Sequence, residues 1–144
     1  MSNSSRLSKM LVIGQFIFVS ILLIDYRNSH FGATMMALMA VTLAVWAFIS
    51  MRKQFSVFPE PKPSRSLIRS GPYRFIRHPM YTALIIWGLG RVLFLFSTAN
   101  LFGFLGLTTI LALKIQHEEK LLSKSFKDYD DYRKTTKRLV PFLY

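Results

Sequence analysis

The chain has 144 residues, of which 51% are hydrophobic, and it carries a formal net charge of +12. That length fits one domain, and high hydrophobicity beside strong positive charge is typical of a membrane protein with basic surfaces. The basic residues avoid the apolar stretches and gather between them, which favours lipid headgroups or an anionic ligand over nucleic acid as their partner. Because there is no cysteine, disulfides, a thiol nucleophile and thiolate metal sites are excluded.

Four apolar stretches predict four membrane-spanning helices, at about residues 8–25, 32–51, 79–96 and 100–115. The first is interrupted only by Gln15 and Ser20 between Met10 and Ile24. We interpret it as a span rather than a signal peptide, because no small-residue cleavage site follows it. The third begins at Pro79, and proline suits the first turn of a helix. Only a few residues join the third and fourth stretches, which predicts an antiparallel hairpin.

The loop 52–78 and the tail 116–144 are the polar parts of the chain. From Arg52 to Arg77 there are seven Lys or Arg against one acid, Glu60, so the positive-inside rule predicts a cytoplasmic loop. Four crossings then place both termini in the cytoplasm. We expect an all-α, multi-pass integral membrane protein that forms a single domain over residues 1–144, with a cytoplasmic pocket formed by the loop and the tail.

A first candidate site lies where this loop enters the third span. Its aromatic and cationic side chains are Tyr73, Arg74, Arg77, His78 and Tyr81. Anchoring at the level of the lipid headgroups explains any one of these side chains. All five lie within nine consecutive residues, however, and this density favours a pocket. Tyr81 follows His78 by about one helical turn, so the two side chains are expected on one face.

A second group, His117, Glu118 and Glu119, follows the fourth span. Adjacent residues on a helix point about 100° apart, so one glutamate is expected to face the hairpin and the other solvent. Because the hairpin is antiparallel, Glu118 is predicted to lie beside His78. Lys114 lies four residues before Glu118, and its simplest interpretation is a surface ion pair. No metal site is expected, because the histidines and glutamates lack ligand spacing.

Gly88, Gly90 and Arg91 lie further along the third span. Two glycines two residues apart face different sides of a helix, which is more typical of close helix packing than of a dimer seam. A charge at Arg91 needs a partner, water or a ligand carboxylate.

The segments GPYRFIRHPMY, WGLG, KIQHEEKLL and YDDYRKTTKRLVPFLY, in this order, resemble the isoprenylcysteine carboxyl methyltransferase family, which is related to phospholipid N-methyltransferases. The resemblance covers roughly the second half of the chain. It implies a membrane enzyme that uses S-adenosyl-L-methionine on the cytoplasmic side, with the lipid bilayer and a hydrophobic, lipid-like methyl acceptor as partners and no nucleic acid.

The resemblance also implies roles for particular residues. The cofactor contacts would be Leu67, Ile68, Tyr73, His78, Pro79, Met80, Tyr81 and Glu118, with Gly88 and Gly90 matching the glycine pair of the phospholipid enzymes. Lys114 replaces the family's arginine near the acceptor, so Lys114 and Glu118 are the candidate catalytic residues. Lysine keeps the positive charge but lacks the bidentate fork that grips a carboxylate.

We therefore predict an S-adenosylmethionine-dependent membrane methyltransferase that resembles isoprenylcysteine carboxyl methyltransferases and whose acceptor is a prenylated or other hydrophobic, lipid-like molecule. Carboxyl O-methylation is one form that this reaction could take. Two alternatives stay open. One is a membrane reductase that uses NADPH, because RHPxY-like segments also occur in sterol reductases. The other is a small membrane protein without catalytic activity that kept the scaffold.

Overall fold

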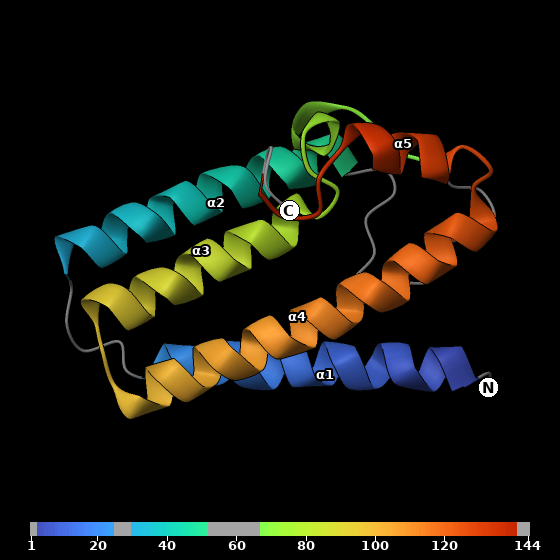
Figure 1. The fold of residues 1–144 in the computed structure, drawn as a ribbon. Coiled ribbons are helices and arrows are strands. Elements are labelled where there is room, and N and C mark those ends of the chain that lie inside the picture. Colours follow the sequence, from blue (N-terminus) through green and yellow to red (C-terminus); the bar gives the residue numbers. More distant parts are fainter. Residues whose placement is uncertain (1–2, 25–29, 52–66, 141–144) are drawn as a thin grey trace.

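A computed structural model describes residues 3–24, 30–51 and 67–140, and these residues form an all-helical fold. In chain order the elements are α1 (Asn3–Ile24), α2 (Phe31–Met51), the 3-10 helix η1 (Gly71–Arg74), α3 (Pro79–Phe94), α4 (Thr98–Ser125) and α5 (Tyr129–Thr135). The predicted all-α class is confirmed. In Figure 1, α2 lies beside α3 and α1 lies beside α4, while α5 sits across the open end of the bundle.

Three helices are long and apolar enough to cross a membrane, within the ranges Ser5–Leu23, Phe31–Met51 and Thr98–Ser125. The helix α3 is apolar but has only 16 residues, which is about 24 Å of rise against a hydrocarbon core of about 30 Å. The helix ends at Phe94, two residues before the predicted end of the third span. The backbone leaves the helix at Leu95, and the Ser97 side chain accepts a hydrogen bond from the Asn100 amide to start α4.

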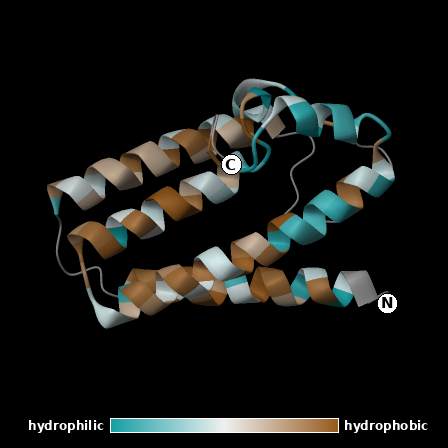
Figure 2. Ribbon diagram, viewed as in Figure 1, coloured by the Kyte–Doolittle hydropathy of each residue, from teal (hydrophilic) through white to brown (hydrophobic). Residues whose placement is uncertain are grey.

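The exposed surfaces of α1 and α2 are apolar, as lipid contact requires. Large apolar side chains are exposed on both helices, among them Ile13, Phe16, Leu38, Val45 and Ile49. Hydrophobic colour runs along the central parts of the helices and gives way to hydrophilic colour at the end of α4 and on α5 (Figure 2). As predicted, α4 continues without a break from the apolar stretch into the polar KIQHEEKLLSKS segment.

The helices α1 and α4 approach closely because glycines line their contact. A Cβ atom on Gly106 would lie 2.1 Å from the Phe18 ring, and one on Gly103 would lie 3.1 Å from Ile21. Small residues allow such close backbone contact between membrane helices. A core of Leu22, Leu107 and Leu111 fills the space toward α3.

The connection into α3 is folded back on the end of α2. Gly71 has a φ of +59°, and a Cβ there would lie 2.0 Å from Ser50 Oγ. Glycine is needed at this position both for its backbone conformation and for the lack of space. The turn that it permits leads through η1 and residues 75–78 into the start of α3.

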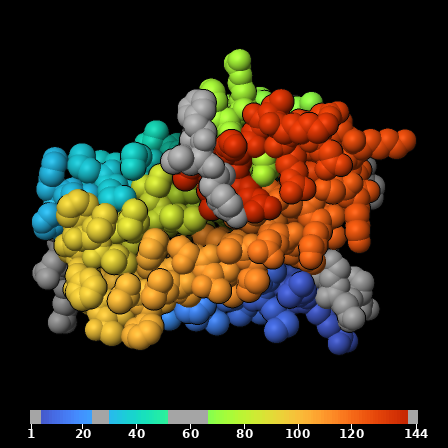
Figure 3. All heavy atoms as spheres, in the orientation of Figure 1, coloured from blue at the N-terminus to red at the C-terminus, as the bar shows by residue number. Residues whose placement is uncertain are grey.

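The C-terminal segment, residues 136–140, runs beside residues 75–78. Lys137 accepts a backbone hydrogen bond from Arg77 and donates one to Phe75, and His78 donates to the carbonyl of Arg138. Ile76 and Lys137 form a parallel β-bridge. In Figure 3 the red C-terminal residues lie directly against the green residues around the start of α3 and against the orange end of α4.

Candidate active site

The first polar contact of the site joins the start of α3 to the polar end of α4. Pro79 sets the first turn of α3, and His78 is the residue that precedes it. His78 Nδ1 lies 3.4 Å from Glu118 Oε2. The predicted proximity of His78 and Glu118 is therefore confirmed, and it follows from the antiparallel course of the two helices.

Glu118 is oriented by its neighbours but remains partly exposed. The Tyr81 hydroxyl donates a hydrogen bond of 2.7 Å to Glu118 Oε1, and the His78 and Tyr81 rings stack with centroids 5.5 Å apart. The side chain of Glu118 is 16% exposed, against 6% for Glu119. Glu118 thus keeps acceptor capacity beyond the bonds that orient it.

Glu119 has a different set of partners. Its Oε1 accepts a hydrogen bond of 2.9 Å from Arg77 Nε, and its Oε2 accepts one of 3.1 Å from Arg138 Nε. His78 Nε2 lies 3.6 Å from the same carboxylate. The expectation that one glutamate faces solvent is wrong, because Glu119 lies deeper than Glu118 among three cationic groups.

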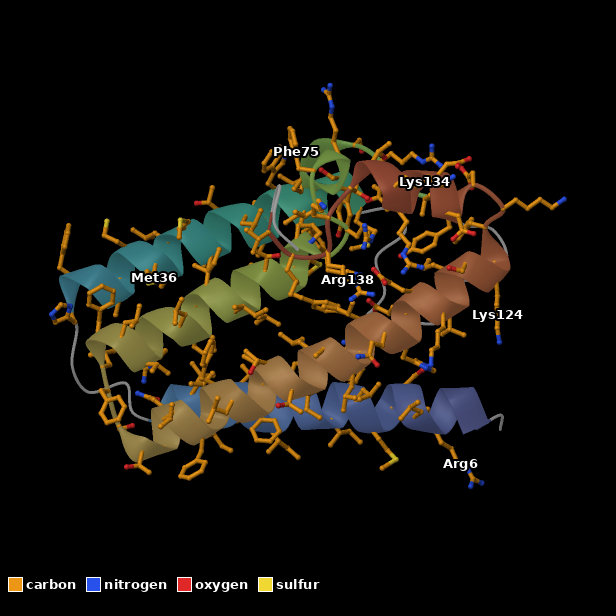
Figure 4. The ribbon with its side chains drawn as sticks, in the orientation of Figure 1. Arg6, Met36, Phe75, Lys124, Lys134 and Arg138 are labelled. Atoms are coloured by element: carbon orange, nitrogen blue, oxygen red, sulfur yellow. The ribbon has the colours of Figure 1, made fainter. Side chains whose placement is uncertain are left out.

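This cluster fastens the C-terminal segment to the bundle. Besides its bond to Glu119, Arg77 donates to the carbonyl and the hydroxyl of Thr136. The Thr82 hydroxyl donates to the Leu139 carbonyl at 2.8 Å. Figure 4 shows Arg138 directed between the start of α3 and α4, whereas Lys124 points away from the helices. The C-terminal segment is therefore attached in two ways. The Glu119 carboxylate binds Arg77 and Arg138, and the backbone of residues 75–78 bonds to that of residues 137–138.

Lys114 is buried and makes no surface ion pair. Its exposed fraction is 2%, and its Nζ donates a hydrogen bond of 2.7 Å to Gln15 Oε1 of α1. The same Nζ lies 5.2 Å from the centroid of the Tyr81 ring. The surface ion pair expected from spacing is wrong, because this face of α4 packs against α1 and α3.

The remaining predicted cofactor residues are only partly gathered around this cluster. Leu67 and Ile68 are half-buried just before η1, Pro79 is buried and Met80 is half-buried. Tyr73 is buried, with its hydroxyl 3.9 Å from Met51 Sδ and its carbonyl accepting a bond from the Tyr132 hydroxyl. Arg74, by contrast, is exposed.

Gly88 and Gly90 lie two to three turns further along α3, where other side chains fill the space around them. A Cβ on Gly88 would lie 2.9 Å from Phe104, and a Cβ on Gly90 would lie 2.8 Å from Met36 Cβ. They face different helices, as predicted from their spacing. Their role as cofactor contacts stays a prediction, because the structure does not bring them to the His78–Glu118 contact.

Three residues of the site were not selected from the sequence. Gln15 is one of two polar residues in an apolar stretch, and this was the sequence signal that could have identified it. Arg138 and Tyr129 lie in the segment YDDYRKTTKRLVPFLY, which carries part of the family resemblance. Neither was singled out, because a charge or an aromatic ring is ordinary in a polar tail. Tyr129 is fully buried, and its hydroxyl has no hydrogen-bond partner among the described residues. His117 lies on the other side of α4, with its Nε2 3.2 Å from Ser8 Oγ.

The charge of His78 gives the stability a pH dependence. Burial lowers the pKa of His78, but hydrogen bonds and charge attraction from Glu118 and Glu119 raise it, and the net shift is upward. A raised pKa means that this stabilisation is complete below the unfolded-state pKa of about 6.5 and is lost as pH rises through the folded-state value.

We therefore expect the melting temperature of the detergent-purified protein to fall as the pH is raised above about 6.5. The fall should be smaller in His78→Gln, which cannot gain or lose this charge. The matched control is His30→Gln, an exposed histidine just before α2 and outside this cluster. An unchanged slope in His78→Gln would contradict the assignment.

These features define a class, a helical membrane protein with a buried polar cluster where α3 and α4 leave the apolar region. The comparison with known proteins is specific: residues 33–124 match the isoprenylcysteine carboxyl methyltransferase family. The chain belongs to the isoprenylcysteine carboxyl methyltransferase family, which confirms the resemblance predicted from the sequence. The match includes His78, Lys114, Glu118 and Glu119 and ends before α5.

Two of three similar proteins carry the name protein-S-isoprenylcysteine O-methyltransferase, and the third has a different name. The chain is 27% identical over 135 residues to protein-S-isoprenylcysteine O-methyltransferase B of Arabidopsis thaliana, covering 91% of this chain and 68% of the relative. It is 31% identical over 102 residues to a protein-S-isoprenylcysteine O-methyltransferase of Schizosaccharomyces pombe, covering 67% and 43%. It is also 31% identical over 84 residues to the nickel-cobalt-cadmium resistance protein NccN of Alcaligenes xylosoxydans xylosoxydans, covering 57% and 39%. The chain thus spans about two fifths of the length of two of these relatives and about two thirds of the third.

Proposed function

We propose that this protein is an S-adenosylmethionine-dependent membrane methyltransferase whose acceptor is a hydrophobic molecule with a carboxylate, of the prenylated-cysteine class. The observation that carries the proposal is the contact between His78, Tyr81 and Glu118 inside a chain of this family. The family name and the names of the relatives support the acceptor class.

The same proposal includes the topology. The chain crosses the membrane four times, with α3 as a short crossing packed against α2, and both termini lie on the cytoplasmic side. The seven basic residues from Arg52 to Arg77 support this orientation. All but three of them fall in residues 52–66, which lie outside the described residues.

The residues present fit the cofactor. Glu118 offers a partly exposed carboxylate for ribose hydroxyls or an amino group, and the Tyr73 ring offers a face for an adenine or a sulfonium. The Tyr81 ring already stacks on His78 and faces Lys114 Nζ, so its contribution is to hold Glu118 through its hydroxyl. The buried Tyr129 hydroxyl, which has no partner among the described residues, is a further donor that a ligand would satisfy. Leu67, Ile68, His78, Pro79 and Met80 complete the proposed wall.

When bound, S-adenosylmethionine supplies a methyl group whose carbon–sulfur bond breaks, leaving its electron pair on sulfur, while a carbon–oxygen bond forms to the acceptor carboxylate. The residues of this chain then have to position the acceptor and exclude water more than they have to move a proton. Lys114 supplies a positive charge for a carboxylate. The C-terminal segment, held by Glu119, covers the site from the aqueous side.

Calorimetric titration of the detergent-purified protein with S-adenosylhomocysteine, with NADPH in parallel, tests the proposal. We expect S-adenosylhomocysteine to bind and NADPH not to bind. Binding of NADPH alone would replace the proposal by a reductase. Binding of neither by a protein with an intact melting transition would favour a scaffold without catalytic activity.

A further inference from the structure

The helix α1 contributes one polar side chain to the site, although it lies before the family-matched residues 33–124. Gln15 is half-buried in the contact between α1 and α4, and its Oε1 accepts the 2.7 Å hydrogen bond from Lys114 Nζ. Its neighbours on the helix, Phe16 and Ile17, are exposed apolar residues. A glutamine amide is costly at this depth unless it is paired, so its presence points to the lysine that it binds.

The pairing of a lysine with a neutral amide has an electrostatic consequence. A buried ammonium is commonly stabilised by a carboxylate, which cancels its charge. Among the described residues no carboxylate lies within ion-pair distance of Lys114 Nζ, and Glu118 attracts its charge only from beyond that distance. Gln15 and the Tyr81 ring orient the ammonium while leaving its positive charge in place.

The Lys114 ammonium lies between the polar cluster and the apolar core. Tyr81 touches both groups, because its ring faces Lys114 Nζ and its hydroxyl binds Glu118. The chain of contacts from His78 through Glu118 and Tyr81 to Lys114 and Gln15 therefore leads from the cytoplasmic-side cluster toward the core between α1, α3 and α4. An apolar acceptor that enters between these helices would meet the ammonium next to the proposed cofactor pocket.

We infer that Gln15 is a positioning residue that holds Lys114 as an uncancelled cation for the carboxylate of the acceptor, so that α1 sets the affinity for the acceptor. The inference rests on the proposed function. It assigns to Gln15 an effect on the acceptor and none on the cofactor. Because a lysine has no rigid fork, a fixed partner such as this amide supplies the orientation that the guanidinium of an arginine has by itself.

Two substitutions at Gln15 separate positioning from packing. In Gln15→Leu the ammonium loses its partner, and in Gln15→Glu it keeps a hydrogen bond but its charge is cancelled. With N-acetyl-S-farnesylcysteine as acceptor, we expect both to raise KM roughly tenfold or more, with a smaller change in kcat. Their affinity for S-adenosylhomocysteine should equal that of the wild type. Ser20→Ala, at an exposed position of the same helix, is the matched control and should leave both constants unchanged.

The Gln15→Glu variant is decisive because it is expected to fold. If Gln15 only supports packing, Gln15→Glu keeps a wild-type KM, and the inference is overturned. It is equally overturned if either variant weakens S-adenosylhomocysteine binding as much as it raises KM. A wild-type protein that binds no S-adenosylhomocysteine refutes the proposed function itself, and the inference with it.

Discussion

Glu119→Ala is expected to destabilise the protein by about 3–5 kcal/mol, which is the usual cost of removing one partner from a buried ion pair. The cost arises mainly at Arg77, whose side chain is 7% exposed and would be left as a buried charge without its carboxylate. Arg138 is 26% exposed and can turn to solvent. The C-terminal segment would then lose its side-chain attachment to α4.

Thermal unfolding in detergent and limited proteolysis within residues 126–140 would measure this effect. We expect a large fall in melting temperature and faster cleavage of the C-terminal segment. Asp130→Ala, which removes an exposed carboxylate from α5, is the control and should change neither. A Glu119→Ala protein with wild-type stability and protection would contradict the role of Glu119 as the attachment of this segment.

Glu118→Gln is expected to weaken binding of S-adenosylhomocysteine by about a hundredfold or more, with a smaller loss of stability than Glu119→Ala causes. Glutamine has the same size and still accepts the Tyr81 hydrogen bond, but it lacks the charge that makes hydrogen bonds to a carboxylate strong. Glu118 is also the more exposed of the two glutamates, so its charge is less needed for folding.

Calorimetry with S-adenosylhomocysteine and a melting curve on the same sample separate the two effects. Glu119→Gln is the comparison. We expect its melting temperature to fall further than that of Glu118→Gln, and its affinity for S-adenosylhomocysteine to fall less. If Glu118→Gln binds S-adenosylhomocysteine as the wild type does, the cofactor pocket lies elsewhere. The assignment of Glu118 to cofactor binding and of Glu119 to stability would then be wrong.

The sequence alone was enough for the features that depend on short stretches of chain. Apolar runs predict helices wherever they occur, Pro79 predicts the start of α3, and the short connection before Thr98 predicts a hairpin. The hairpin also predicts that the start of α3 lies beside the polar end of α4, which brings His78 near the two adjacent glutamates. The family resemblance also rests on segments that can be read directly. The apolar run continues to Phe96, whereas the helix α3 ends at Phe94, so the sequence did not predict the end of this helix.

Only the tertiary structure decided the roles of side chains whose partners are remote in sequence. Lys114 and Gln15 are 99 residues apart, and Arg77 and Thr136 are 59 apart. Spacing on one helix relates Lys114 to Glu118, but the packing of α1 against α4 gives the lysine a neutral partner instead. Likewise, two adjacent glutamates are equivalent until Gly71 turns residues 72–78 over the bundle and brings Arg77 to Glu119. Periodicity determines which residues share a face of one helix, whereas burial and partner depend on which other helix covers that face.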